Sequence, residues 1–301
     1  MARKTPQEHA QKQASAVVRQ MISTKTIGTD SARTIDNLQG DLQKIALDFR
    51  EDYGTALKNI TVEQAQQYLV DRATELTQPS LDRVRESLDK LLHHTQAQDK
   101  ESKLEKVHSE KETILSSRSY THEQIALIVD SQREQNSLST EIAAAAGLRA
   151  HELLTIQRID ERPATTVENK ESLVTAKFSG QDANYTVQGK GGLVREVYIP
   201  SHLAERLEER RLDSPRLVTD RGVNYQQSYN INGGQRWSNS FSQASNRALG
   251  WSHGGHGLRH TYAQQRMDSL ARQNISYNDA RLVVSRELGH FRAYIVEVYL
   301  R

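Results

Sequence analysis

Apolar residues in the first hundred positions recur at the three- and four-residue spacing of an amphipathic helix. A capping box of Thr61 and Gln64 opens one such segment, VEQAQQYLVDRA, and Pro79 separates it from the next, SLDRVRESLDKLLHH. The apolar stripe of that next segment consists of Leu81, Val84, Leu88, Leu91 and Leu92. The earlier segment TIDNLQGDLQKIALDF has an equivalent stripe at Ile35, Leu38, Leu42, Ile45, Ala46 and Phe49. We therefore predict a helical domain over residues 1–100.

The segment that follows breaks this pattern. Residues 95–118 are highly charged and include few large apolar side chains. We predict a linker over residues 101–119. The alternative is an exposed helix, because Lys and Glu are good helix formers.

A second region with a regular apolar pattern begins at Tyr120. Thr121 and Gln124 form a capping box before HEQIALIVDSQ, and TEIAAAAGLRAHELLTI continues the helical spacing. Residues 172–200 then alternate apolar and polar positions around GQDAN and GKGG, which predicts a small antiparallel sheet. The spacing is helical again from Ser238 onward.

The composition agrees with a mainly α protein that carries a small antiparallel β-sheet in two domains. The length of 301 residues suits two domains, which we place at residues 1–100 and 120–301. The absence of cysteine excludes disulfides, thiolate nucleophiles and Cys-ligated zinc, and with no secretory signal it favours an intracellular protein. The formal net charge of +2 permits a polyanionic partner without requiring one.

Two short motifs present basic side chains. In GLRAHEL, Arg149 and Glu152 are three residues apart and share a helix face; read alone, they are an ordinary surface ion pair. In VQGKGGLVREVYIP, Lys190 sits in a glycine-flanked turn, where an ammonium can donate a proton or contact a phosphate. The alternative is a solvated turn lysine.

A third motif, HGGHGLRHTYAQQRM, is rich in histidine. His256 and Arg259 share a helix face, and His253, His256 and His260 offer possible metal ligands. The glutamate that follows the first histidine in a metalloprotease is missing, because position 257 is glycine. We therefore expect no metal at this motif.

The last motif is LGHFRAYIVEVYLR. His290 precedes Tyr294 by four residues and Tyr299 by nine. Both tyrosines could bury their rings on a final helix, and we favour packing for Tyr294. Taken together, the motifs supply two arginines, a lysine, two histidines and a tyrosine, a set suited to phosphoryl transfer through a covalent tyrosine ester.

These motifs, in the order GLRAHEL, GKGG, HGLRH and LGH with a tyrosine nine residues after the histidine, resemble those of the tyrosine recombinases, the phage-type integrases. The specific resemblance covers residues 120–301. The helical region resembles the core-binding domain of the family only loosely. The resemblance implies the catalytic residues Arg149, Lys190, His256, Arg259, His290 and Tyr299.

The resemblance also implies their roles. Arg149 and Arg259 would hold the scissile phosphate, and Lys190 would protonate the leaving 5′ oxygen. His290 would donate a hydrogen bond to a non-bridging oxygen, and Glu152 would orient its cationic neighbours.

Tyr299 is the implied nucleophile. It would attack the phosphorus to form a 3′-phosphotyrosine, and His256 would exchange a proton with it or bind the phosphate. Tyr294 matches no catalytic position, and Tyr262 occupies a position where the family places a packing aromatic residue.

The activity implied is that of a site-specific recombinase of a mobile element, working without metal, cofactor or ATP. Its partners would be double-stranded DNA attachment sites, bound by a homotetramer that forms a Holliday junction, with an accessory DNA-bending protein as a further possible partner. Such a protein is expected in the bacterial cytoplasm, associated with the nucleoid. The alternatives are a type IB topoisomerase, a telomere resolvase and a non-catalytic DNA-binding regulator.

The DNA contacts of the helical domain are less defined. The resemblance places positive charge on the inner face of a DNA clamp, for which we select Arg83, Arg85 and Lys90; a solvated helix face is the alternative. Residues 1–22 could be a basic tail, an arm or a contact between protomers.

The residues around Tyr299 at the end of the sequence lead to two further expectations, on regulation and on mobility. Only Leu300 and Arg301 follow Tyr299, whereas many family members continue with a segment that packs on a neighbouring protomer. Either another surface regulates assembly or the sequence is truncated. Because terminal segments fray, we expect Tyr299 to be mobile without DNA.

Overall fold

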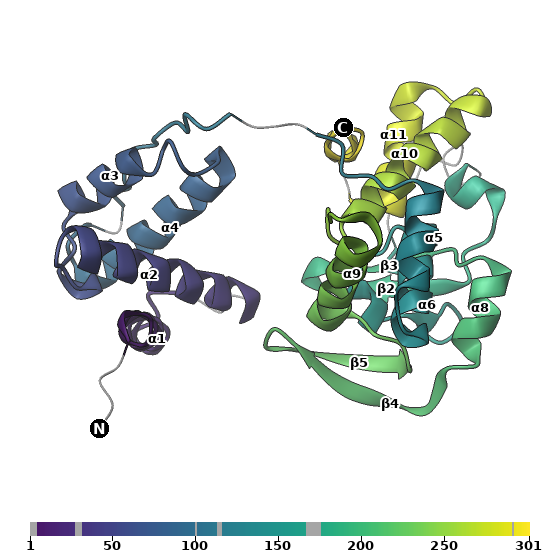
Figure 1. Cartoon of the computed structure of the whole chain (residues 1–301), viewed down its shortest axis with the longest axis horizontal. Coiled ribbons are helices and arrows are strands. Elements are labelled where there is room, and N and C mark those ends of the chain that lie inside the picture. The colour runs from purple at the N-terminus through teal and green to yellow at the C-terminus, as the bar shows by residue number, and fades with distance from the viewer. Residues whose placement is uncertain (1–4, 28–31, 100, 113–115, 167–175, 291) are drawn as a thin grey trace. The chain divides into compact units, whose positions relative to one another are not determined.

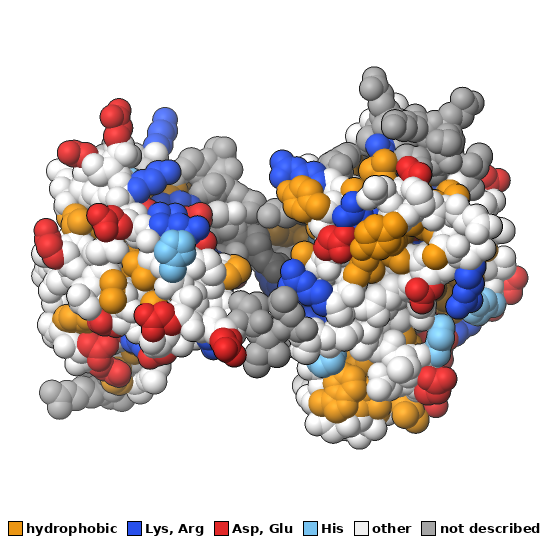
Figure 2. Space-filling view, turned by 90° about the horizontal axis from the view of Figure 1, so that it is seen from above, with side chains coloured by type: hydrophobic (Ala, Val, Ile, Leu, Met, Phe, Trp, Pro, Cys, Tyr) orange, Lys and Arg blue, Asp and Glu red, His pale blue; other side chains and the backbone are white. Residues whose placement is uncertain are grey.

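The chain forms two compact units, residues 1–114 and 115–301 (Figure 1). The computed structural model describes every residue except 1–4, 28–31, 100, 113–115, 167–175 and 291. Figure 2 shows acidic, basic and apolar side chains interspersed over the visible face of each unit, in keeping with the small net charge. Within these described parts, no helix is both long and apolar enough to cross a membrane.

The first unit is helical, as predicted. Its elements are α1 (Pro6–Ser23), α2 (Ala32–Asp52), the short 3₁₀ helix η1 (Leu57–Asn59), α3 (Val62–Asp71) and α4 (Gln78–Thr95). The capping box of Thr61 and Gln64 is confirmed at the start of α3. Pro79 lies in the first turn of α4, where the N–H that proline lacks has no helical partner to lose.

Residues 6–23 belong to the core of this unit and are not a free tail. A second capping box, Thr5 with Glu8, opens α1. Helix α1 buries the small and apolar side chains of Ala10, Ala14, Val18 and Met21, mainly against the predicted stripe of α2. The spacing of these residues is helical, but three of the four are small or β-branched, so the pattern is weak in the sequence.

The segment expected as a linker is partly bound to the first unit. Leu104 is buried, and its N–H donates to Asp89 Oδ1 at 2.8 Å. The N–H of Ser109 donates to Gln78 Oε1 at 2.8 Å. The described residues 101–112 contain no helix, so the chain here is an extended strap on α4. Charged side chains face solvent while backbone groups make these contacts.

The second unit combines helices with a three-stranded sheet and a separate two-stranded ribbon (Figure 1). The sheet has the order β1-β2-β3 and is antiparallel throughout, with strands β1 (Gln157–Arg158), β2 (Tyr185–Gln188) and β3 (Val194–Val197). The ribbon pairs β4 (Arg211–Asp220) with β5 (Val223–Tyr229). The α-helices are α5 (His122–Asp130), α6 (Glu134–Ala146), α8 (Ser201–Glu208), α9 (Gly234–Leu249), α10 (Gly257–Arg272) and α11 (Tyr277–Glu287). Short 3₁₀ helices are η2 (Glu152–Leu154), η3 (Lys177–Gly180), η4 (Lys190–Gly192) and η5 (Ala293–Tyr299).

The sheet differs in detail from the sequence prediction. The GKGG hairpin between β2 and β3 is present, but residues 177–180, expected to lead into the GQDAN turn as a strand, form η3. The outer partner of β2 is instead β1. Residues 172–175 of the predicted sheet lie outside the described residues.

Two apolar clusters support this unit. One joins the sheet to α5, α6 and α9, with Trp237 and Phe241 among its largest buried side chains. The other joins α10, α11 and η5 and includes Tyr262, Val284, Leu288, Val296 and Tyr299. The second cluster therefore fixes the C-terminal motif against the helix that carries HGLRH.

Helix α6 ends earlier than its apolar pattern predicted. The pattern continued to residue 156, but Gly147 caps the helix with a φ of +59°. A Cβ at this position would lie 2.8 Å from both Leu288 Cδ2 and Tyr262 Cδ1. Gly147 is thus required both by its left-handed backbone and by the close approach of α10 and α11.

We predict that Gly147→Ala destabilises the second unit more than Gly250→Ala. Gly250 also caps a helix with positive φ, at +80°, but nothing lies within 4 Å of the point where an alanine methyl group would sit. Gly250→Ala should cost about 1–2 kcal/mol of unfolding free energy, and Gly147→Ala about 1–3 kcal/mol more from overpacking. Urea unfolding measures both, and equal losses would contradict the packing argument.

Candidate active site

The predicted catalytic motifs converge in the second unit. The loop after α6 brings Arg149 and Glu152, the start of α10 brings Arg259, and the end of α11 brings His290. The 3₁₀ helix η5 brings Tyr299 to the same place. Segments far apart in the sequence thus place their polar side chains within hydrogen-bonding distance of one another.

Glu152 is the buried anion of this site. Its side chain has no exposed surface, and its Oε1 accepts from Arg149 Nη1 at 2.7 Å. Its Oε2 accepts from the backbone N–H of Arg149 and from Arg195 Nη2, both at 2.8 Å. Burial alone would raise the pKa of this carboxyl, but the charges of Arg195, Arg259 and Arg149 outweigh it and hold the pKa well below its usual range. Arg149 and Glu152 are therefore not a surface ion pair.

Arg259 is the deepest cation. Its side chain is fully buried, and it donates to the carbonyl oxygens of Gly147 and, at 3.0 Å, of Leu288. Burial, followed by the charge of Arg149, lowers its pKa to about 10, so the guanidinium remains charged at neutral pH. The two carbonyls fix it between the loop after α6 and the end of α11.

His290 lies at the centre of the contacts. Its Nε2 is 3.2 Å from Arg149 Nη2, 3.4 Å from Arg259 Nη2 and 3.2 Å from the Tyr299 hydroxyl. Burial, then the charges of Arg149 and Arg259, lowers its pKa to about 4. The ring is therefore neutral at neutral pH and has a nitrogen lone pair available to a donor.

Tyr299 is docked in the site, and its mobility without DNA stays a prediction. Its side chain is 5% exposed, and Arg259 lies over its ring at 5.4 Å and 3.5 Å from its hydroxyl. Gln264 Nε2 donates at 3.1 Å to the carbonyl oxygens of both Tyr299 and Arg301. Packing and these two backbone contacts hold the segment that carries Tyr299 against α10.

Tyr294 does not pack in the core, so that prediction is wrong. The side chain is 59% exposed, and its hydroxyl accepts from Arg292 Nη1 at 3.0 Å. The segment is a 3₁₀ helix, in which residues three apart share a face, and Val296 and Tyr299 are its buried pair. Tyr262 is buried as expected, and burial raises the pKa of its hydroxyl, which donates to Glu287 Oε2 at 2.9 Å.

The other two histidines of HGGHGLRH flank the tyrosine. The rings of His256 and His260 lie 5.6 and 5.1 Å from that of Tyr299. His260 is buried, and burial lowers its pKa to about 4. His253 packs against Trp251 and Tyr120 instead. Among the residues that the structure describes, no cluster of three or more His, Cys, Asp or Glu side chains could hold a metal ion.

Lys190 lies in η4, in the turn between β2 and β3. The N–H of Gly189 donates to the Leu193 carbonyl at 2.7 Å and closes this turn. A Cβ at Gly189 would lie 3.5 Å from Glu152 Oε1, so the turn begins beside the buried carboxylate. The Lys190 side chain itself is outside the described part of the chain.

The candidate DNA-binding side chains of α4 belong to the first unit. Arg83 is exposed and pairs with Asp41 at 3.0 Å. Arg85 donates to the Leu104 carbonyl at 3.3 Å and so holds the strap, while Lys90 is half-buried. The contacts of Arg83 and Arg85 lie within the first unit, and DNA binding by these three residues stays a prediction.

Two buried arginines were not selected from the sequence. Arg195 pairs with Glu152, and Arg266 forms a bidentate pair with Glu287, at 2.9 and 2.8 Å. The signal for Arg195 was present, because on β3 it alternates with the buried Val197 and so occupies an inward position.

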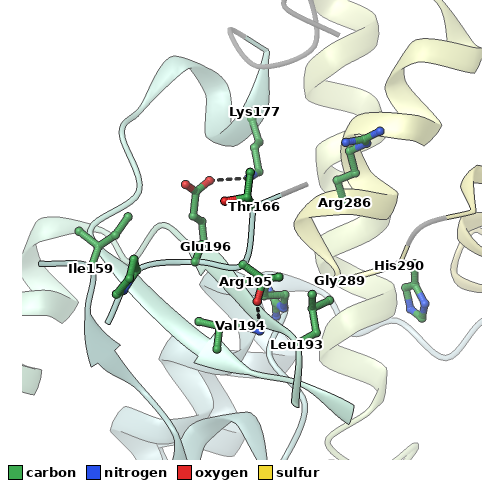
Figure 3. Close-up of a pocket in the computed structure, with 13 residues that line it drawn as sticks. Ile159, Thr166, Lys177, Leu193, Val194, Arg195, Glu196, Arg286, Gly289 and His290 are labelled. Atoms are coloured by element: carbon green, nitrogen blue, oxygen red, sulfur yellow. Dashed lines mark hydrogen bonds and ion pairs between the residues drawn. The ribbon is translucent and has the colours of Figure 1, made fainter. Parts of the chain in front are cut away.

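A cavity of about 460 Å³ adjoins the site. Figure 3 shows His290 and Gly289 at one side of it and the ion pair of Lys177 with Glu196, 2.7 Å long, at another. Residues of β3 line the wall between them.

Known proteins were compared with this chain at three levels. No protein-family model matches it, and no curated protein sequence matches it. Solved structures do match. A lambda integrase dimer bound to a COC′ core site is 17% identical, with a TM-score of 0.57 over 93% of this chain and 92% of that chain. The Tn1549 transposon integrase in complex with transposon right end DNA is 11% identical, with a TM-score of 0.56 over 97% and 94%.

The XerH site-specific recombinase bound to difH substrate is 17% identical, with a TM-score of 0.51 over 100% of this chain and 94% of that chain. The chain has the tyrosine recombinase fold. At these identities the similarity establishes the fold alone, so any activity has to be argued from the residues of the site. The mainly α fold with small antiparallel sheets, predicted from the sequence, is confirmed.

We predict that stability falls as the pH drops from about 6.5 to about 4. His260 and His290 have pKa values of about 4 when folded and 6.5 when unfolded, so the unfolded chain binds more protons in this window. Their contribution is complete above pH 6.5 and is lost by pH 4. The carboxyl of Glu152, with its lowered pKa, adds a loss only below its unfolded value of 4.5.

Urea unfolding at several pH values tests this. In His290→Asn the unfolding free energy should fall less steeply with decreasing pH, by the slope that corresponds to about one bound proton. An identical slope in the variant and the parent would contradict the neutral, buried imidazole.

We also predict that Gln264→Glu loosens the segment carrying Tyr299. The substitution replaces an amide donor with a carboxylate facing two carbonyl oxygens. Hydrogen exchange of residues 293–301 should accelerate about ten-fold, for a loss of about 1.4 kcal/mol. Gln265→Glu, on the exposed face of α10, is the matched control, and equal exchange in both variants would rule out the tether.

Proposed function

We propose that this protein is a site-specific DNA recombinase that cuts and rejoins strands through a 3′-phosphotyrosine at Tyr299. The observation that carries the proposal is the position of the Tyr299 hydroxyl, 3.2 Å from His290 Nε2 and 3.5 Å from Arg259 Nη2. A buried tyrosine beside two guanidinium groups and a neutral imidazole can attack a phosphodiester.

In the proposed first step, Arg149 and Arg259 bind the non-bridging oxygens of the scissile phosphate. Guanidinium groups suit this role because their forked donors match phosphate oxygens and offset the charge of the transition state. Arg149 is 22% exposed, whereas Arg259 is fully buried. Arg149 is therefore the group that a phosphate meets first.

The Tyr299 oxygen then forms a bond to phosphorus as the bond to the 5′ oxygen breaks. The tyrosine proton passes to a neutral imidazole. His290 is the nearest by hydrogen-bond distance, and His256, whose ring lies 5.6 Å from that of Tyr299, is the alternative acceptor. Partial burial, then the charge of Arg259, lowers the pKa of His256. Lys190 supplies a proton to the leaving 5′ oxygen.

The covalent ester retains the energy of the phosphodiester, so attack by a 5′ hydroxyl reverses the step and reseals the strand without ATP. No metal ion takes part in the proposal, since guanidinium groups supply the positive charge. Glu152 stays ionised throughout and holds the cations in place.

The proposed substrate is a duplex attachment site of a mobile genetic element, bound through both units. Two of the similar structures are DNA complexes of integrases: a transposon integrase in complex with transposon right end DNA, and a lambda integrase tetramer bound to a Holliday junction. The second has a TM-score of 0.57 and is 16% identical. By this likeness we propose a homotetramer that exchanges strands through a Holliday junction, with an accessory DNA-bending protein as an optional partner.

We predict that Tyr299→Phe abolishes a covalent protein–DNA adduct, because the variant lacks the attacking oxygen. The substrates are nicked suicide duplexes cut from the DNA that flanks the gene, and the adduct is detected on a denaturing gel. Tyr294→Phe is the control and should retain the activity, since that side chain is exposed and its hydroxyl contacts Arg292, which is not one of the proposed catalytic residues. Arg149→Ala or Arg259→Ala should lower the cleavage rate by about 10²–10³-fold.

Other outcomes would favour other functions. An adduct that persists in Tyr299→Phe would refute the nucleophile. Relaxation of plasmids that lack the site would favour a type IB topoisomerase, and closed hairpin ends would favour a telomere resolvase. DNA binding with no adduct from the parent protein would favour a regulator.

A further inference from the structure

Arg195 connects segments that the proposed catalysis uses. It is 6% exposed and lies on β3, five residues after Lys190. One guanidinium nitrogen, Nη2, donates to Glu152 Oε2 at 2.8 Å, and the other, Nη1, donates to the carbonyl oxygen of Glu287 at 2.5 Å. The side chain therefore ties the lysine hairpin to the loop after α6 and to the end of α11.

We propose that Arg195 is a positioning residue, which sets the placement of Arg149 and His290 by joining Glu152 to the end of α11. The inference rests on the proposed function and deepens it. No contact of Arg195 with DNA is required, because its guanidinium is committed to protein oxygens at both ends.

Arg195 first restrains the carboxylate of Glu152. Its two oxygens receive the side chain and the backbone N–H of Arg149 together with Arg195. Without Arg195, one oxygen would keep only the Arg149 N–H and the more distant Arg259, at 3.9 Å. The carboxylate would then be held closely by Arg149 alone, and without this second anchor the orientation of Arg149 would change with it.

Arg195 also restrains the backbone that leads to His290. Arg195 donates to the carbonyl of Glu287, three residues before it, and passes directly beside Gly289. Gly289 has a φ of +74°, and a Cβ there would lie 2.7 Å from Arg195 Cδ. The glycine of LGH therefore both turns the chain toward His290 and leaves room for the arginine.

A lysine cannot replace this contact. A single ammonium nitrogen can reach the Glu152 carboxylate or the Glu287 carbonyl, whereas the planar fork of an arginine reaches both. Arg195→Lys thus keeps the buried charge and removes the bridge, which makes it the sharpest test.

The control is Lys177→Met. Lys177 pairs at 2.7 Å with Glu196, the neighbour of Arg195 on β3, and lines the same cavity (Figure 3). Glu196 points to the other face of the strand, so this variant removes a nearby cation without touching the bridge.

The full-length protein is tested on the same suicide duplex. We expect Arg195→Lys to slow covalent adduct formation about 10- to 100-fold, as a small misplacement of reacting groups does, while its DNA affinity stays within about two-fold. Imidazole NMR signals of His290 should shift in the DNA-free variant. Lys177→Met should change neither the rate nor these signals.

Three results would overturn the positioning role. Cleavage by Arg195→Lys at the parent rate would leave Arg195 as a packing residue. Loss of cooperative unfolding, or of DNA affinity in proportion to cleavage, would make its role structural. If the parent protein forms no adduct, the proposed function fails, and unchanged His290 signals in Arg195→Lys would then independently refute the positioning role.

Discussion

The ionised carboxylate of Glu152 is the contact on which the rest of the site depends. It is fully buried, and its partners come from its own loop, from β3 and from α10. Moving a lone carboxylate into such a position is costly, and only close cations with good hydrogen-bond geometry offset that cost. Removing one partner of a buried pair costs about 3–5 kcal/mol, so the fold and the arrangement of the arginines cannot be separated. The same anion that stabilises the second unit also aims Arg149.

A second buried anion extends this arrangement to the C-terminal motif. The Glu287 carboxylate accepts hydrogen bonds from Nε and Nη2 of Arg266, from the Tyr262 hydroxyl and from the N–H of Phe178. Its backbone carbonyl accepts one from Arg195. These contacts anchor the end of α11 on three sides. His290 lies three residues after Glu287, so this network of satisfied polar groups helps to fix its position.

Local patterns in the sequence predicted the parts of the fold that depend on local structure. The capping boxes at Thr61 and Thr121, and the apolar stripes of the first unit, are present because each helix buries one face. The sequence did not predict the β4–β5 ribbon, since most of its side chains are exposed and no apolar face alternates along it. Nor did it identify Arg195, because a buried guanidinium is expected only where a buried carboxylate pairs with it, and the sequence did not show that Glu152 is buried. The order and spacing of the four motifs predicted the candidate site. The exposure of Tyr294 and the burial of Tyr299 depend on the 3₁₀ geometry of η5, which the spacing did not predict.

The charges of the site suggest why a docked tyrosine need not react before substrate arrives. Three guanidinium groups, those of Arg149, Arg195 and Arg259, face a single carboxylate. Burial, then the charges of Arg149 and Arg259, lowers the pKa of His290, so the imidazole next to the Tyr299 hydroxyl is a weak base. A bound phosphodiester would bring the missing negative charge, raise the basicity of the imidazole and occupy the arginines at the same time. In the proposed mechanism the substrate would therefore activate the nucleophile, and a Tyr299 positioned in advance would stay unreactive until DNA is bound.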